Sequence, residues 1–283
     1  MKWTKWQWVA LIWIVSVFAG VLILLLLGPW IMDDFWFVLV GPFVVASLLG
    51  IWLTAGMGPV WLRLLGMLVG QSLLVALMGM GSGESAVGFT PGLAATTALT
   101  ALAMLGLGCA GSILPIHSTW SVRIALWEIV VSIGLIGVTF AVIRLVSEIY
   151  TWEWTQWASQ AGAHFLVFSL YTGGLMTLTL LPLLVRGKGP QVFSAIMLLL
   201  AVVLIPPIEA TTFDLLRLSG GDIELFYAAH IGQTVMALAI MIPLVAAFPG
   251  VLVRQTPPAV KPVEQTAQKR IPSETEEDFA EMQ

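Results

Sequence analysis

The sequence is poor in charged residues, in cysteine and in histidine. Aspartate, glutamate, lysine and arginine make up 10% of its 283 residues, whereas 59% of the residues are hydrophobic. Soluble domains carry about 25% charged residues, so water alone does not solvate this chain. The net charge of −4 is also small and negative, and we therefore expect no nucleic-acid partner.

The shortage of cysteine and histidine excludes several kinds of site. The one cysteine, Cys109, cannot form an internal disulfide, and it has no basic neighbour in the chain to activate its thiol. The sequence contains no Walker-type lysine loop and no Gly-x-Ser-x-Gly, His-Glu-x-x-His or Cys-x-x-Cys motif. We therefore expect a non-catalytic protein without a metal site.

Long apolar runs fill most of the first 250 residues instead. A helix needs about 20 apolar residues to cross a bilayer, and uniformly apolar runs favour helices over the alternating strands of a barrel. The sequence thus predicts an all-α integral membrane protein, a polytopic bundle of about eight transmembrane helices surrounded by lipid. We expect these helices at about 9–27, 35–54, 60–80, 93–116, 124–146, 160–185, 190–208 and 225–248.

Proline and glycine residues indicate where these helices end. Gly28-Pro29-Trp30 is expected to end the first helix, and Pro206–Pro207 the seventh. A polar connection at 209–224 would follow the seventh helix, with a short interfacial helix at 212–218. The bundle would thus occupy residues 1–252. Residues 253–283 have almost no large apolar side chains and are predicted to be a disordered cytoplasmic tail, in which 254–283 docks a membrane or cytoplasmic protein.

The basic residues are distributed unevenly between the two sides of this predicted bundle. Ten of the 12 lysines and arginines fall on the side of the N-terminus, and only Arg144 and Arg217 fall on the other side. The acidic residues Asp33, Asp34, Glu84, Glu148, Glu153, Glu209, Asp214, Asp222 and Glu224 gather on that other side. The positive-inside rule then predicts a bacterial cytoplasmic (inner) membrane protein with both termini in the cytoplasm.

The chain shows signs of two similar halves, 1–117 and 118–252, of four helices each. Gly56-Met-Gly-Pro59 and Gly187-Lys-Gly-Pro190 precede the third helix of each half. Parallel repeats of this kind build some transporters. The alternative is that Gly-x-Gly-Pro is simply suited to a tight turn between helices.

Small residues recur four positions apart within several runs, for example Ala46/Gly50, Gly106/Ala110 and Ser169/Gly173. Such pairs let two helices approach closely in lipid, where helices gain little from the hydrophobic effect. They predict a compact bundle.

Ionisable residues inside an apolar run are costly, and each needs a partner or a function. Arg144 and Glu148 are four residues apart, which predicts a structural ion pair on one helix face. Glu128 is the more demanding case: it is either paired with Arg123 or protonated, or it is a carboxylate that handles protons or cations during transport.

His164 and His230 are expected on different helices, both a few residues below the outer surface. His230 shares a helix face with Gln233 and Thr234. Two histidines at one depth could bind haem as a cofactor; the more common alternative is a pair of hydrogen-bonded residues that join helices.

Three functional hypotheses follow from these features. The leading one is a non-catalytic membrane protein, for example a subunit whose tail binds a partner. The first alternative is a small-solute or ion transporter that uses Glu128 in a pathway between the two halves. The second is a membrane redox subunit that holds haem between His164 and His230.

Overall fold

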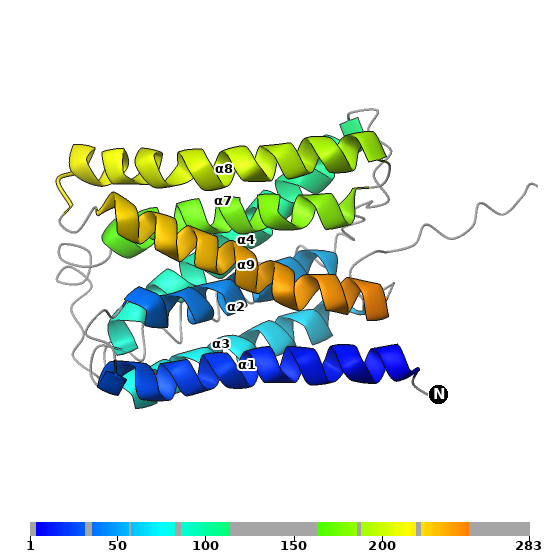
Figure 1. The fold of residues 1–283 in the computed structure, drawn as a ribbon, viewed down its shortest axis with the longest axis horizontal. Helices are drawn as coiled ribbons and strands as arrows, with labels where there is room; N and C mark the ends of the chain where they lie inside the picture. The colour runs from blue at the N-terminus through cyan, green and yellow to red at the C-terminus, as the bar shows by residue number, and fades with distance from the viewer. Residues whose placement is uncertain are drawn as a thin grey trace, which may run out of the picture.

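The computed structural model describes residues 4–31, 36–56, 58–82, 86–113, 163–185, 188–218 and 222–248. These residues form seven α-helices and no strand. The helices are α1 (Lys5–Ile31), α2 (Trp36–Ala55), α3 (Val60–Ser82), α4 (Ala86–Ile113), α7 (Ala163–Leu184), α8 (Lys188–Leu215) and α9 (Ile223–Ala247). They lie side by side along one direction, with α8 at one edge of the bundle and α1 at the other (Figure 1).

Six of the described helices, all except α2, are long and apolar enough to cross a membrane. The described part of the chain therefore has the all-helical, multi-pass architecture that the sequence predicts. Seven of the eight predicted helices correspond to described ones. The fifth, at 124–146, lies outside the described residues, as does the tail 253–283. The number of eight helices and the division into two halves stay predictions.

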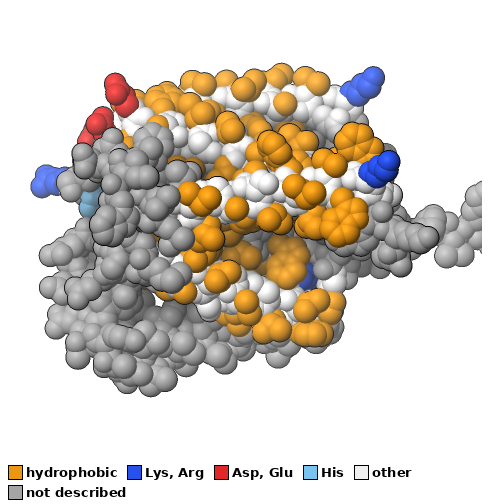
Figure 2. All heavy atoms as spheres, turned by 60° about the horizontal axis from the view of Figure 1, so that its bottom comes forward, with side chains coloured by type: hydrophobic (Ala, Val, Ile, Leu, Met, Phe, Trp, Pro, Cys, Tyr) orange, Lys and Arg blue, Asp and Glu red, His pale blue; other side chains and the backbone are white. Residues whose placement is uncertain are grey.

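The outward faces of the bundle are apolar. Large hydrophobic side chains stand exposed along α1 and α8, among them Trp6, which is 78% exposed, and Leu199, which is 67% exposed. Figure 2 shows hydrophobic side chains spread along the length of the bundle rather than gathered in one patch. Surfaces of this kind are solvated by lipid tails rather than by water.

Charged side chains lie at the two ends of the bundle, with basic ones at one end and mainly acidic ones at the other. Lys5 begins α1, Arg63 lies near the start of α3 and Lys188 begins α8. The side-chain amide of Gln7 in α1 donates a hydrogen bond to the backbone carbonyl of Ala247 in α9, so the start of α1 and the end of α9 lie together. The opposite end carries Asp214, Arg217, Asp222 and Glu224, around the connection from α8 to α9. Figure 2 shows the acidic side chains together at that end.

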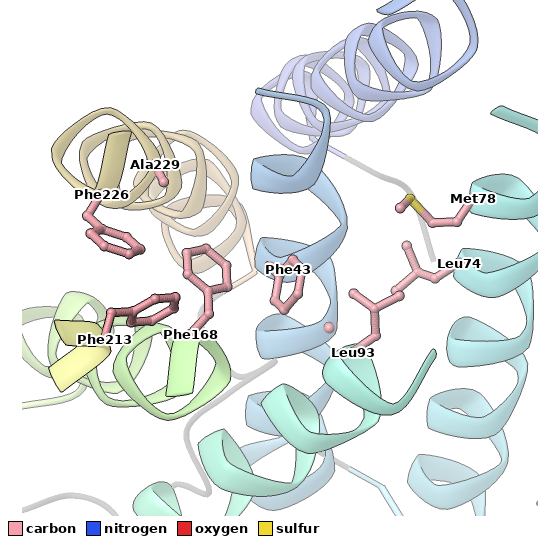
Figure 3. Packing of buried hydrophobic residues seen from close by; sticks show 9 residues of the cluster. Phe43, Leu74, Met78, Leu93, Phe168, Phe213, Phe226 and Ala229 are labelled. Atoms are coloured by element: carbon pink, nitrogen blue, oxygen red, sulfur yellow. The ribbon is translucent and has the colours of Figure 1, made fainter. Parts of the chain in front are cut away.

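An aromatic core lies between α2, α7, α8 and α9. Phe43 and Phe168 meet edge to face with ring centres 4.9 Å apart, and Phe213 and Phe226 lie 5.0 Å apart. All four rings are buried, and Leu93 of α4 packs into the same cluster (Figure 3). Edge-to-face packing of this kind holds several helices in one arrangement.

Close approach of α2 to α4 depends on one of the predicted small residues. A Cβ atom added to Gly50 would lie 2.4 Å from the carbonyl oxygen of Thr97, so only glycine fits there. A Cβ atom on Gly173 would lie 3.2 Å from the hydroxyl oxygen of Thr100. Gly106 has no such neighbour within 4 Å. The predicted pairs at Gly50 and Gly173 therefore lie at helix contacts, whereas the position of Gly106 is open.

The prediction that Pro206–Pro207 ends the seventh helix is wrong. The helix α8 continues through both prolines to Leu215. Pro207 has no N–H to donate to the carbonyl of Val203, but the hydroxyl of Tyr227 in α9 donates to that carbonyl at 2.9 Å. A donor from a neighbouring helix thus replaces the missing hydrogen bond, and the helix does not need to stop.

The predicted interfacial helix at 212–218 is also wrong, because residues up to 215 belong to α8. The helix ends in a Schellman motif. The amide of Leu218 donates to the carbonyl of Phe213 at 2.8 Å, and the amide of Arg217 donates to the carbonyl of Asp214 at 3.0 Å. Arg217 takes the left-handed conformation, with φ 55°, that this motif requires. Leu218 packs against the cluster that contains Phe213, as the motif's apolar contact does.

Two further expectations about turns are changed by the structure. Gly28-Pro29-Trp30 does not end the first helix, because α1 continues to Ile31; proline this close to the end disturbs only the last turn. The Gly-x-Gly-Pro motifs also differ in position. Gly58, with φ 107°, and Pro59 precede α3, whereas Pro190 lies within the first turn of α8.

Candidate functional site

The structure places Glu209 inside the bundle, against His230. The expectation that Glu209 belongs to an outer polar loop is wrong, because α8 continues past it and turns its side chain inward. Both side chains are completely buried. An ionisable pair in the interior of a membrane-type bundle is costly to bury and is a candidate functional site.

Four side chains form a hydrogen-bonded chain at this site. The Nε2 atom of His230 lies 2.5 Å from the Oε2 atom of Glu209, and the Nδ1 atom lies 3.1 Å from the Oε1 atom of Gln233. The hydroxyl of Thr172 in α7 also donates to Gln233 Oε1, at 3.4 Å. The chain therefore connects α8, α9 and α7 through polar atoms.

Helical periodicity explains why these residues meet. On α9, His230, Gln233, Thr234 and Ala237 follow one face and all are buried. On α8, Glu209 and Phe213 are four apart and are buried together. Glu209 is six residues from the end of α8 and His230 is seven residues beyond the start of α9, so each lies about 10 Å inside the acidic end of the bundle.

The ring of Phe168 stacks on the imidazole of His230. Phe168 lies nearly parallel to it, with ring centres 5.8 Å apart and an angle of 15° between the planes. His164, at the start of α7, instead meets the edge of Phe213, with ring centres 5.6 Å apart. Figure 3 shows Phe168 and Phe213 within the aromatic core. The two histidines therefore belong to one region of the bundle but have different partners.

The donor set at His230 does not fit a haem iron. An axial histidine ligand must present a ring nitrogen to the metal. Both ring nitrogens of His230 face acceptor groups of the protein, Glu209 and Gln233. Among the described residues, no three histidine, cysteine, aspartate or glutamate side chains are grouped as metal ligands. The predicted haem contact would require His230 to leave Glu209.

Several other buried hydroxyl groups form hydrogen bonds within or between helices. The hydroxyls of Thr96, Thr100 and Thr177 each donate to the carbonyl four residues earlier in the same helix. Thr97 donates to the carbonyl of Ala46 at 2.9 Å, which joins α4 to α2. These contacts satisfy polar groups and hold helices together, so they indicate packing rather than a binding site.

Arg63 has a structural contact at the basic end. Its Nη1 atom donates to the carbonyl of Leu53 at 2.7 Å and to that of Thr54 at 3.2 Å. These carbonyls belong to the last turn of α2, where no amide of the helix is available to them. A positive charge at a helix C-terminus is also favoured by the helix dipole.

Three of the site residues predicted from the sequence cannot be placed. Glu128, Arg144 and Glu148 all lie outside the described residues. The transport role of Glu128 and the ion pair of Arg144 with Glu148 therefore stay predictions. The residue that sequence reasoning missed is Glu209, although its spacing from Phe213 would have placed it on a helix face.

The sequence matches no model of a known protein family, and no curated protein or solved structure is significantly similar to the chain.

Proposed function

We propose that this chain is a non-catalytic, multi-pass protein of a bacterial cytoplasmic membrane, with its basic end and both chain ends in the cytoplasm. The supporting observation is the separation of charge between the ends of the bundle. Lys5, Arg63 and Lys188 lie at one end, and Asp214, Asp222 and Glu224 lie at the other end together with one arginine, Arg217. Loops rich in lysine and arginine are retained on the cytoplasmic side of such membranes.

Labelling of single cysteines tests this orientation. Cys109→Ser removes the one native thiol, and Thr4→Cys or Asp222→Cys then adds one at either end of the bundle. A membrane-impermeant maleimide applied to intact cells should label Asp222→Cys, and it should label Thr4→Cys only after the membrane is permeabilised. The reverse pattern would contradict the proposed orientation, and equal labelling in intact cells would contradict a membrane-spanning bundle between the two positions.

A small-solute or ion transporter is the second candidate function, and the Glu209–His230 pair favours it. Buried carboxyl and imidazole groups mark proton and ion pathways in membrane proteins. In the described part of the chain this pair lies between α8 and α9, so Glu128 is not the one candidate for proton handling.

Proton movement into liposomes tests the transport candidate. Purified protein is reconstituted with a pH-sensitive dye inside, and a pH gradient is imposed with and without a panel of amino acids, sugars and organic acids. Wild-type protein should dissipate the gradient faster than protein-free liposomes with at least one solute, and Glu209→Gln should lose this effect. Asp214→Asn, an exposed change on the same helix, is the matched control. Decay equal to that of protein-free liposomes under every condition would contradict the candidate.

The subunit hypothesis concerns residues 254–283, outside the described residues. If this tail docks a membrane or cytoplasmic protein, full-length chain purified in mild detergent should retain a stoichiometric partner that a chain ending at residue 253 loses. Purification of the same lone protein from both would argue against it.

The haem alternative stays a prediction without support from the geometry of His230. An absorption spectrum of the purified protein tests it directly. A Soret band that is lost in His164→Ala would restore this alternative.

A further inference from the structure

Two titratable side chains meet inside the bundle. The Nε2 atom of His230 lies 2.5 Å from the Oε2 atom of Glu209, and its Nδ1 atom faces the side-chain amide of Gln233. A carboxylate oxygen only accepts hydrogen bonds, so a hydrogen lies between Oε2 and Nε2 in this contact. With an ionised carboxylate and a neutral imidazole, the pair would place one net negative charge between α8 and α9.

We infer that Glu209 and His230 form a proton-binding site in the interior of the bundle, which holds one proton between Oε2 and Nε2. The ionised carboxylate and neutral imidazole carry one negative charge together. They take one proton from a hydronium ion, which leaves as water, and the pair becomes neutral. Its net charge is then zero whether the proton resides on the carboxyl group or makes the imidazole an imidazolium.

Burial is the physical reason why the pair holds this proton. Both side chains are completely buried. A net charge is strongly disfavoured in an apolar interior, whereas a neutral hydrogen-bonded pair is tolerated. The stacked ring of Phe168 covers one face of the imidazole and further excludes water. The proton therefore removes the charge that the fold could not otherwise bury.

The described polar side chains on the neighbouring helices leave the number of protons in the Glu209–His230 pair unchanged. From α7, Thr172 contacts Gln233, while the hydroxyl of Tyr171 contacts Thr212. His164 on the same helix contacts Phe213 instead. The described side chains of α2, at 40–55, include no ionisable group. The charged residues Asp214, Arg217, Asp222 and Glu224 lie beyond the pair, in and around the connection from α8 to α9.

One oxygen of Glu209 is open to a proton donor from outside the pair. The Oε1 atom is buried and makes no hydrogen bond to any described residue. Buried polar atoms of this kind are usually satisfied by ordered water. A water molecule at Oε1 would give the carboxyl group a second contact, through which the proton can exchange. Occupancy of this site by a proton does not depend on transport, because the pair can hold the proton whether or not it crosses the membrane.

Two spectroscopic measurements on the full-length protein in lipid bilayers at neutral pH test the inference together. Infrared spectra report a protonated carboxyl group through its C=O band, and ¹⁵N NMR of labelled histidine reports whether Nε2 of His230 carries a proton. We expect one of two results: a carboxylic-acid band that is lost in Glu209→Gln and kept in Asp214→Asn, or a doubly protonated His230. A singly protonated His230 without the carboxylic-acid band would overturn the inference.

Both measurements can be assigned without depending on one variant. Glu209→Gln is isosteric, and its amide can donate to His230. If it does not fold, Glu209→Asp keeps a carboxyl group in altered surroundings and should shift the band instead of removing it. The chain has three histidines, so a protein with both His117→Gln and His164→Gln keeps only the resonance of His230. A band unaffected by either Glu209 variant, with His230 singly protonated, would again overturn the inference.

Discussion

The indole N–H of Trp13 in α1 donates a hydrogen bond to the carbonyl of Ala239 in α9 at 2.9 Å. This carbonyl is the one that Pro243, four residues later, leaves without an amide donor. Tyr227 does the same for the carbonyl of Val203 that Pro207 leaves free. Two prolines inside helices are thus each matched by an aromatic donor from another helix. In lipid, water is not available to these carbonyls, so the two donors help to hold α1 and α8 against α9.

The first prediction concerns the hydroxyl group of Tyr227. Tyr227→Phe removes the donor to Val203 and should lower the free energy of unfolding by about 0.5–1.5 kcal/mol, the usual net value of one hydrogen bond. In a Pro207→Ala background, the new amide at position 207 supplies the missing donor. The same Tyr227→Phe change should therefore cost clearly less there. Unfolding in mixed micelles of mild detergent and SDS measures the cost of Tyr227→Phe in the wild-type and in the Pro207→Ala background. An equal cost in the two backgrounds would contradict the proline matching.

The same relationship shows which parts of the fold the sequence could predict. Apolar runs identify helices reliably, since lipid leaves the backbone few alternatives, and all seven described helices overlap predicted ones. Their ends are harder to predict. Pro207 does not end α8, and the donor to the carbonyl that it leaves free comes from a residue 20 positions away, on a different helix. That information lies in tertiary contacts and not in the local pattern.

The error at Pro207 also explains the error at the site. A helix that ends at residue 208 places Glu209 in a solvated loop, and the sequence then offers His164 as the residue to compare with His230. The shared face of His230, Gln233 and Thr234 was predicted and is confirmed, because it depends only on helical periodicity. The partner across α8 could not be predicted without the correct helix end.

The second prediction concerns the stability that the Glu209–His230 contact supplies. His230→Ala leaves a buried carboxyl group without its partner, which should cost about 1–3 kcal/mol or more. The adjacent change Ile231→Ala alters a side chain that is 47% exposed, and it serves as the control. Thermal unfolding in detergent compares the two variants. Equal melting temperatures would show that the contact adds nothing to the fold.

The third prediction concerns the contact between α2 and α4. Gly50→Ala places a methyl group 2.4 Å from the carbonyl of Thr97, so the helices must separate, at a cost of about 1–3 kcal/mol. Gly106→Ala on α4 meets nothing within 4 Å and should be neutral, or stabilising by up to about 1 kcal/mol, since alanine favours a helix. Unfolding in SDS micelles should therefore show a lower free energy of unfolding for Gly50→Ala and an unchanged or higher one for Gly106→Ala. A Gly50→Ala protein as stable as Gly106→Ala would contradict the close approach.

The last prediction concerns Arg63 and the end of α2. Its guanidinium donates to the carbonyls of Leu53 and Thr54, which no helical amide reaches. Hydrogen bonds from a charged donor contribute about 1.5–3 kcal/mol, and Arg63 is only 8% exposed, so little water would replace it. Arg63→Gln should therefore lower the melting temperature, and Arg63→Lys should recover part of the loss because it keeps the positive charge at the helix end. Lys5→Gln, an exposed change at the same end of the bundle, controls for loss of charge alone. If Lys5→Gln lowers the melting temperature as much as Arg63→Gln does, Arg63 acts through the net charge of this end rather than as a cap on α2.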